Sequence, residues 1–358
     1  MSRSMQLRPE FFKPEQMLKT PMEITTKQAK KGVVVITGAS AGVGRATARL
    51  FGRKGYDVAL LARGEEALEA AKKEIEALGQ KARWYKVDVA DAQAVEEAAE
   101  KIEQELGPIE VWVNNAMNSV FSPVKDMKPE EYKRVTDVTY LGQVYGTLSA
   151  LKRMRSRNRG SIVFVGSALA YRGIPLQSAY CGAKHAIQGF FDSLRTELLH
   201  DDSPISISMV ELPALNTTQF GFVKNRLPNR PRPMGKIYQP EVAADAILFA
   251  AEHKRREVLV GFPTVQAIVG NKLAPWFADW VLSRTGIKGQ QTQQPKDPNQ
   301  KHNLWEPVPG VHGAHGEFGE KAHEHSTQLW ISKHKPELLA GLLLLGGLLT
   351  GGLLMTRR

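Results

Sequence analysis

Short apolar segments alternate with amphipathic segments over most of the chain, and this alternation restricts the fold more than any other feature. Seven segments rich in Val, Ile and Leu read as strands; they span roughly 33–37, 58–62, 83–88, 110–114, 161–166, 205–210 and 257–261. The intervening amphipathic runs predict helices at 64–78, 92–106, 130–155, 178–200 and 240–252. Strands that alternate with helices are typical of α/β proteins. We therefore predict an α/β fold with a doubly wound parallel seven-stranded sheet, whose ligands bind beyond the carboxyl ends of the strands.

A glycine-rich turn joins the first strand to the first helix. The strand is followed by Gly38-Ala39-Ser40-Ala41-Gly42-Val43-Gly44, and the helix opens at Arg45. Glycines let the backbone approach a pyrophosphate, and a helix N-terminus supplies free N–H groups and a positive dipole. The turn therefore predicts a dinucleotide phosphate site; an ordinary tight turn between a strand and a helix is the alternative.

A tyrosine and a lysine share one face of the expected helix 178–200, because Tyr180 and Lys184 are four residues apart. Tyrosine alone is a poor acid or base at neutral pH, since its usual pKa is about 10, and a nearby ammonium lowers that pKa by favouring the phenolate. The hydroxyl of Ser167, thirteen residues before Tyr180, could hold a carbonyl oxygen beside the phenol. Together these groups predict a proton-transfer site for a carbonyl and its alcohol. Chance spacing is the alternative for the Tyr–Lys pair alone.

Several motifs within residues 31–265 follow one another in the order found in a known family. The chain reads Thr37-Gly38-x-x-x-Gly42-x-Gly44, then Asp88-Val89, Asn114-Asn115-Ala116, Ser167, Tyr180 and Lys184, and finally Pro213 with Thr217 or Thr218. In these motifs the chain resembles the short-chain dehydrogenase/reductase family. The resemblance implies a Rossmann-type domain that binds a nicotinamide dinucleotide and interconverts a small-molecule carbonyl and its alcohol.

The resemblance also implies roles for individual residues. Ser167, Tyr180 and Lys184 match the catalytic set. Tyr180 and Lys184 also contact the cofactor, together with Gly38, Ser40, Ala41, Gly42, Val43, Gly44, Asp88, Val89, Asn114, Ala116, Pro213 and Thr217. Three positions depart from the family pattern: Met117 and Ala214 replace glycines, and Thr139 replaces an asparagine that helps to hold a relay water. We expect Thr139 to hold that water and include it among the catalytic residues.

The end of the second strand distinguishes the two nicotinamide cofactors. An NAD-selective domain usually ends this strand with an acid that bonds the ribose 2′-hydroxyl. Here the strand ends without an acid and Arg63 follows. A guanidinium can pair with a 2′-phosphate in a bidentate fork, so Arg63 predicts NADP(H). A solvated loop arginine is the alternative.

The chain has 358 residues, more than the roughly 250 of a common α/β domain. We predict a mobile basic arm at 1–30, the dehydrogenase domain at 31–287, a linker or extension at 288–335, and a hydrophobic C-terminal segment at 336–358. Within the domain, the proline- and arginine-rich stretch 213–238 is expected to form the substrate lid. An amphipathic run at 266–287 is expected to pack on the domain or on a second subunit.

The C-terminal segment carries a membrane signal. Residues 338–355 are eighteen uncharged residues, flanked by lysines and arginines. As a helix they would extend roughly 27 Å, close to the ~30 Å of a bilayer core. We therefore predict a C-terminal tail anchor with the catalytic domain on the cytoplasmic side. A helix lying on the bilayer surface and an oligomer contact are the alternatives.

Charge and composition restrict the partners. The formal net charge is +11, partly from a cluster of lysine and arginine at 152–159, but no recognition motif accompanies it, so we predict no nucleic-acid partner. A positive surface favours anionic lipid. The four histidines within 312–325 have no cysteine partner or helical register, and we predict no metal site. The single cysteine, Cys181, excludes an intramolecular disulfide framework. The family resemblance implies a homo-oligomer formed through helices within 92–155 and 178–200.

The residues therefore favour an NADP(H)-dependent oxidoreductase in which Tyr180 protonates the oxygen, Ser167 orients it, and Lys184 binds the cofactor ribose. A membrane anchor would favour a lipid-like substrate. A catalytically weak cofactor-binding scaffold or redox sensor is the rival hypothesis, motivated by Thr139 and Met117. A membrane-tethered assembly factor is a third, with no specific residue in its favour.

Overall fold

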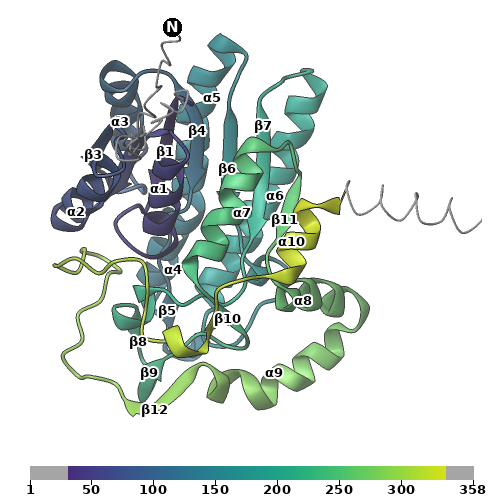
Figure 1. Cartoon of the computed structure of the whole chain (residues 1–358). Helices are drawn as coiled ribbons and strands as arrows, with labels where there is room; N and C mark the ends of the chain where they lie inside the picture. The colour runs from purple at the N-terminus through teal and green to yellow at the C-terminus, as the bar shows by residue number, and fades with distance from the viewer. Residues whose placement is uncertain (1–30, 336–358) are drawn as a thin grey trace, which may run out of the picture.

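A seven-stranded parallel sheet forms the centre of the fold (Figure 1). The computed structural model describes residues 31–335, so the expected N-terminal arm and hydrophobic tail lie outside the described residues. In spatial order the strands are β11 (Glu257–Leu259), β7 (Ser206–Glu211), β6 (Ser161–Val165), β4 (Ile109–Asn114), β1 (Val33–Thr37), β2 (Asp57–Ala62) and β3 (Ala82–Lys86). The strand order reverses between β4 and β1, and the predicted doubly wound α/β fold is confirmed.

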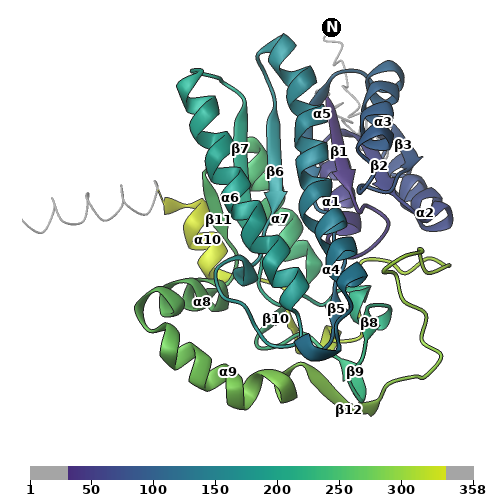
Figure 2. The same cartoon turned by 180° about the vertical axis from the view of Figure 1, so that it is seen from behind.

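Helices cover both faces of the sheet, which explains why the central strands are apolar along their whole length. In β1, Val34 and Ile36 face one apolar cluster while Val33 and Val35 face the other. The first face is covered by α1 (Gly42–Arg53), α2 (Glu65–Glu76) and α7 (Pro240–Glu252). The second is covered by α3 (Ala92–Glu105), α5 (Gly142–Arg157) and α6 (Ser178–His200), as Figure 2 shows from behind.

The single helix predicted for 130–155 is interrupted. It consists of α4 (Pro129–Thr136), a π-helical segment (Asp137–Leu141) and α5. At the junction Gly142 lies so close to Val89 that a Cβ on the glycine would be 2.7 Å from a Val89 methyl. The extra residue of a π turn is a local feature that helical periodicity does not reveal, and such turns are frequent at functional sites.

The segment 288–335, expected to be a linker or an extension, wraps around the domain. Strand β12 (Gln291–Pro295) pairs with β9 (Asn229–Pro231), and β13 (Ala322–His323) pairs with β10 (Ile237–Tyr238), so the predicted lid stretch is bound to the C-terminal extension. A further short pair joins β5 (Val120–Phe121) to β8 (Lys224–Asn225).

Two side chains of the extension enter the interior. Leu304 is fully buried, and Leu329 of α10 (Thr327–Lys333) joins the main core. Lys333 at the end of α10 pairs with Asp245 of α7 at 2.7 Å. Buried contacts of this kind make the extension part of the folded domain, which sequence composition alone could not indicate.

The amphipathic run expected at 266–287 forms a helical hairpin. It consists of α8 (Phe262–Leu273) and α9 (Pro275–Gly289), and Pro275 begins the second helix. One side of the hairpin faces the domain, whereas several aromatic side chains of α9 are exposed. Among residues 31–335 no helix combines the length and apolar character needed to cross a bilayer.

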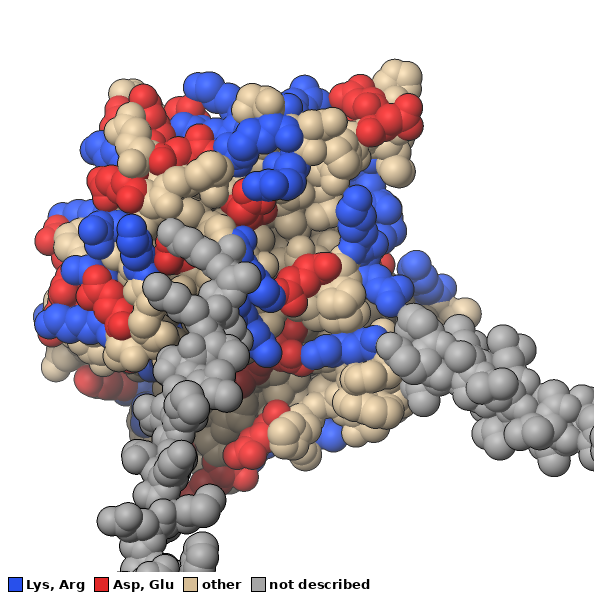
Figure 3. Space-filling view, turned by 45° about the horizontal axis from the view of Figure 1, so that its top comes forward, with Lys and Arg blue, Asp and Glu red and all other residues tan. Residues whose placement is uncertain are grey.

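The basic cluster at the end of α5 is paired with acids. Arg153 and Lys152 contact Glu96, at 3.0 and 2.7 Å, and Arg157 contacts Glu103 at 2.6 Å. The neighbouring Arg155 and Arg159 pair with acids as well. Figure 3 shows Lys and Arg interspersed with Asp and Glu over one face of the molecule. These ion pairs give the cluster a structural role in joining α5 to α3 and to the sheet.

Candidate active site

A cavity of about 840 Å³ lies at the carboxyl ends of the central strands, where the topology predicts a ligand. Most of the predicted site residues line it; these are Gly38, Ser40, Ala41, Gly42, Val43, Arg63, Asp88, Val89, Ala116, Ser167, Tyr180, Lys184, Pro213 and Thr217. Three predicted residues, Gly44, Asn114 and Thr139, do not line it.

The glycine turn forms one wall of the cavity. Gly38 and Gly42 have φ of +67° and +55°, a conformation that L side chains rarely adopt. Ala41 is the N-cap of α1 and offers no side-chain cap, so backbone N–H groups of the first turn face the cavity side. Gly44 has a different function: a Cβ there would lie 2.2 Å from the Gly38 carbonyl oxygen. It therefore permits the close packing of α1 on the turn.

The adjacent residues Asn114 and Asn115 point in different directions at the end of β4. The Nδ2 of Asn114 donates to Thr147 of α5 at 2.9 Å, and its Oδ1 accepts from the Trp112 indole, so its buried side chain points away from the cavity. Asn115 lines the cavity and its Nδ2 donates to the Thr37 carbonyl at 2.9 Å. The Asn115 side chain thus lies at the cavity and that of Asn114 does not, as the alternation of side chains along a strand could have indicated. The cofactor contact of Asn114 stays a prediction.

The predicted catalytic side chains meet in the middle of the cavity. Ser167 follows β6, and its hydroxyl accepts a hydrogen bond from the Leu169 N–H at 3.1 Å. Tyr180 and Lys184 lie in the first two turns of α6, and the Lys184 ammonium is 5.5 Å from the centre of the Tyr180 ring. The ammonium donates to the Val165 carbonyl at 2.6 Å, which fixes it at the end of β6.

Burial controls the protonation of this set. It raises the pKa of the Tyr180 phenol above its usual range, and the Ser167 hydroxyl opposes this by hydrogen bonding. Burial lowers the pKa of Lys184 to about 8, opposed by the charge of Glu211. The sequence predicted a lowered pKa for Tyr180. The pKa of Tyr180 is instead raised, because the cost of burying the phenolate outweighs the stabilisation that its neighbours give to that charge.

Thr139 does not belong to the catalytic cluster. Its hydroxyl donates to the Asn118 carbonyl at 3.1 Å and accepts from the Asn118 N–H at 3.1 Å, within the π-helical segment. The hydroxyl therefore connects the π-helical segment to the backbone of Asn118, and the role of Thr139 in holding a relay water stays a prediction.

The cofactor end of the cavity is crossed by residues 303–316, which we call the C-terminal strap. Asn303, Pro307, Val308 and His312 of the strap line the cavity. Two strap carbonyls accept hydrogen bonds from the Arg63 guanidinium, that of Asn303 at 2.5 Å and that of Trp305 at 2.6 Å.

The strap is also fixed at the glycine turn and between the helices. The carbonyl of Gly313 accepts from the Gly42 N–H at 3.0 Å. The carbonyl of Leu304 accepts from Arg134 at 3.0 Å, and Arg134 pairs with Asp88 at 2.5 Å. Sequence reasoning missed these contacts, because no periodicity marks a segment that binds mainly through its backbone carbonyls.

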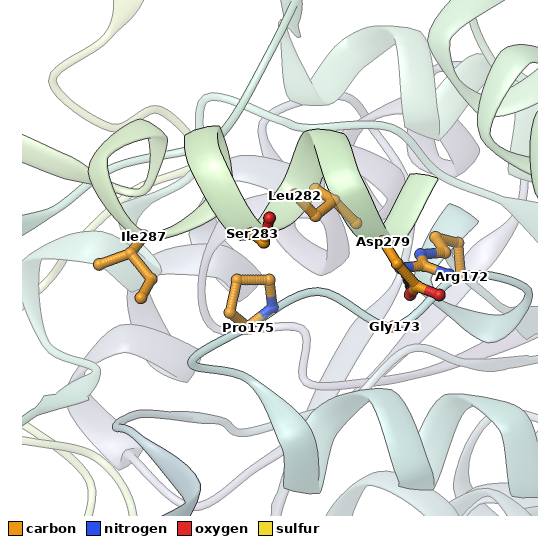
Figure 4. Close-up of a pocket in the computed structure, with 7 residues that line it drawn as sticks. All are labelled: Arg172, Gly173, Pro175, Asp279, Leu282, Ser283 and Ile287. Carbon is orange, nitrogen blue, oxygen red and sulfur yellow. Dashed lines mark hydrogen bonds and ion pairs between the residues drawn. The ribbon is translucent and has the colours of Figure 1, made fainter. Parts of the chain in front are cut away.

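Apolar side chains also line the cavity. Among them are Met117, Ile174, Met234 and Phe277, together with other residues of α8 and α9. Figure 4 shows α9 against the loop that contains Pro175, where Arg172 lies beside Asp279. The guanidinium of Arg172 pairs with Asp279 at 2.6 Å, which ties the loop to the helical hairpin.

Comparisons with known proteins agree with this geometry. The sequence profile described as short chain dehydrogenase matches residues 32–226. The chain is 34% identical over 297 residues to the uncharacterized oxidoreductase YxnA of Bacillus subtilis (strain 168), covering 82% of this chain and 83% of that protein.

Two solved structures share the fold. One is a metagenomic short-chain oxidoreductase in complex with NADP, at 26% identity and a TM-score of 0.55, over 65% of this chain and 97% of that one. The other is an alcohol dehydrogenase of the archaeon Thermococcus sibiricus complexed with 5-hydroxy-NADP, at 27% identity and a TM-score of 0.55, over 64% and 95% of the two chains. Both ligands are of the cofactor class predicted from Arg63.

Proposed function

The chain belongs to the short-chain dehydrogenase family, and from this premise we propose that it is an NADP(H)-dependent oxidoreductase that interconverts a carbonyl and an alcohol. The observation that carries the proposal is the meeting of Ser167, Tyr180 and Lys184 in the cavity that the glycine turn also lines. A general acid beside a positively charged group and an oxygen-binding hydroxyl is the arrangement that this proton transfer requires.

The cavity residues fit NADP(H). The uncapped first turn of α1, with its glycines at positive φ, suits a pyrophosphate. Arg63 lies in the same cavity without an acid beside it in the sequence and suits a 2′-phosphate. Lys184 would hold the ribose nearest the reacting ring. When bound, the cofactor supplies or accepts the hydride at the carbon of the carbonyl or alcohol.

Tyr180 is the proposed proton donor in the reductive direction. A tyrosine phenol, with a usual pKa of about 10, holds its proton at neutral pH, and burial raises the pKa of Tyr180 further, so the proton is available for a carbonyl oxygen. Ser167 would orient that oxygen through its hydroxyl. The product is an alcohol whose O–H carries the proton of Tyr180, and the Lys184 ammonium stabilises the phenolate that remains.

The substrate that best fits the cavity is an apolar carbonyl compound. Met117, Ile174, Met234 and Phe277 supply apolar surface in the cavity. The proposal includes tethering of the enzyme to a membrane by residues 338–355, because an apolar substrate partitions into a bilayer. A homo-oligomer is what the family resemblance implies, and a catalytic domain on the cytoplasmic side follows from the proposed tail anchor.

The proposal is tested by NADPH oxidation with a panel of carbonyls that includes retinal, steroid, acyl and small aromatic ketones. We expect turnover with NADPH, weaker turnover with NADH, and a preference for the larger apolar carbonyls. Tight NADPH binding without turnover of any carbonyl would contradict the proposal and favour a cofactor-binding scaffold or redox sensor.

A further inference from the structure

The outer face of the α8–α9 hairpin carries large apolar side chains in contact with solvent. The exposed fraction is 79% for Leu273, 71% for Trp276 and 53% for Trp280. It is 61% for Phe262 and 50% for Phe277. The Phe277 ring contacts both Trp276 and Trp280, with ring centres 5.8 Å apart in each pair, so these three side chains form one aromatic patch. A patch of this kind on an otherwise charged surface marks a docking site.

Helical geometry separates this face from the one that lines the cavity. Ala278, Val281 and Leu282 lie on the side of α9 that lines the cavity. At 3.6 residues per turn, Trp276 and Trp280 project from the opposite side of the helix. The aromatic face is therefore free of the packing that holds α9 to the domain.

The charges around the patch favour an anionic lipid surface over a second protein. Residues 262–289 contain three cations, Lys272, Arg284 and Lys288, all exposed, and one acid, Asp279, which is paired with Arg172. Arg284 lies over the Trp280 ring at 4.3 Å. Tryptophan, phenylalanine and leucine beside lysine and arginine are typical of helices that lie in a membrane interface, whereas the centres of protein interfaces are poor in lysine.

The continuation of the chain points to the same partner. Helix α10 lies beside α8 in both views (Figures 1 and 2), and the sequence continues from it into the uncharged residues 338–355. The described chain thus ends at a helix that lies beside the hairpin, and an uncharged segment follows it in the sequence. We propose that the outer face of α8–α9 docks on a bilayer that contains anionic lipid.

If the enzyme acts on an apolar carbonyl, as proposed above, docking on this face also affects how the substrate reaches the cavity. Gln266, Gly270 and Phe277 of the hairpin are exposed and also line the cavity. A docked enzyme therefore presents this border of its cavity to the bilayer. An apolar substrate would then move between membrane and active site without crossing bulk water.

The test is hydrogen–deuterium exchange of the full chain with vesicles of phosphatidylcholine, alone or with phosphatidylglycerol. We expect the anionic vesicles to slow amide exchange within 262–289 by at least about fivefold. In the double variant Trp276→Ser/Trp280→Ser this protection is lost, while the control Leu199→Ser, an exposed leucine at the far end of α6, keeps it. Neither tryptophan lines the cavity, so the cofactor affinity of the double variant serves as a check of folding.

Two results would overturn the inference. The first is unchanged exchange within 262–289 when the full chain binds the anionic vesicles through other residues. The second is protection that grows with protein concentration in the absence of vesicles, because that result identifies a second copy of the chain as the occupant. Neither readout depends on turnover, so a failure of the proposed function is distinguishable from a failure of this inference.

Discussion

The guanidinium of Arg63, directly after β2, donates a hydrogen bond of 2.6 Å to the backbone carbonyl of Trp305 in the C-terminal strap. The residue predicted to select the cofactor is therefore also the residue that binds the extension to the domain. In the same way, the strap carbonyl of Gly313 accepts a hydrogen bond from the Gly42 N–H in the glycine turn. Cofactor binding and the position of the strap are consequently coupled through shared hydrogen-bond donors.

Replacement of Arg63 by alanine tests its role in cofactor choice. A hydrogen bond to a charged group contributes about 1.5–3 kcal/mol, so Arg63→Ala should weaken NADPH binding by about 10–100-fold. NADH binding should change little, because NADH lacks the 2′-phosphate. Calorimetric titration with both cofactors measures the difference, with Arg53→Ala, an exposed arginine of α1, as the control. Equal losses for NADH and NADPH would assign Arg63 to the strap alone.

Glu211 makes stability depend on pH. It is fully buried at the end of β7, and burial together with the charge of Glu257 raises its pKa to about 8, against the attraction of Lys184. Between the ordinary glutamate pKa of about 4.3 and a pKa of about 8, the folded state keeps a proton that the unfolded state has lost. The free energy of unfolding should therefore fall as the pH rises through this window.

The variant Glu211→Gln removes this titration and keeps the shape of the side chain. The free energy of unfolding of this variant should not fall between about pH 5.5 and 8. Near pH 8 the variant should therefore be more stable than the unchanged protein by about 1–3 kcal/mol. Urea unfolding at several pH values measures this, and Glu97→Gln, an exposed glutamate of α3, is the control. A parallel pH dependence in Glu211→Gln and the unchanged protein would show that the carboxyl ionises freely.

Leu304 tests whether the C-terminal extension belongs to the folded domain. It is fully buried and packs against Val120, Val135, Ala179 and Ala183. Truncation of a buried leucine to alanine costs about 2–5 kcal/mol, so Leu304→Ala should lower the unfolding free energy by that amount in one transition. The exposed Leu199 gives the matched control Leu199→Ala. A separate early transition of the extension would contradict the account.

The sequence predicted most of the fold and the centre of the site, because both depend on local patterns. Short runs of apolar residues identify the strands that are buried on both faces, and three glycines within seven residues identify the turn. Sequence reasoning did not indicate that Asn114 and Thr139 lie outside the cavity lining, because the direction of their side chains depends on neighbours far along the chain, such as Thr147 and Asn118. The strap could not be predicted, because backbone carbonyls bind Arg63 and carry no residue-specific signal.

The central claim is that Tyr180 is the proton donor for a carbonyl substrate, and Tyr180→Phe tests it most directly. Tyr171→Phe is a matched control, because Tyr171 is a neighbouring tyrosine whose hydroxyl bonds Glu257 and which does not line the cavity. With the best carbonyl of the panel and saturating NADPH, we predict that Tyr180→Phe lowers kcat by about 100–10,000-fold with unchanged NADPH affinity, while Tyr171→Phe stays close to the unchanged enzyme. Turnover by Tyr180→Phe at the rate of the Tyr171→Phe control would contradict the account.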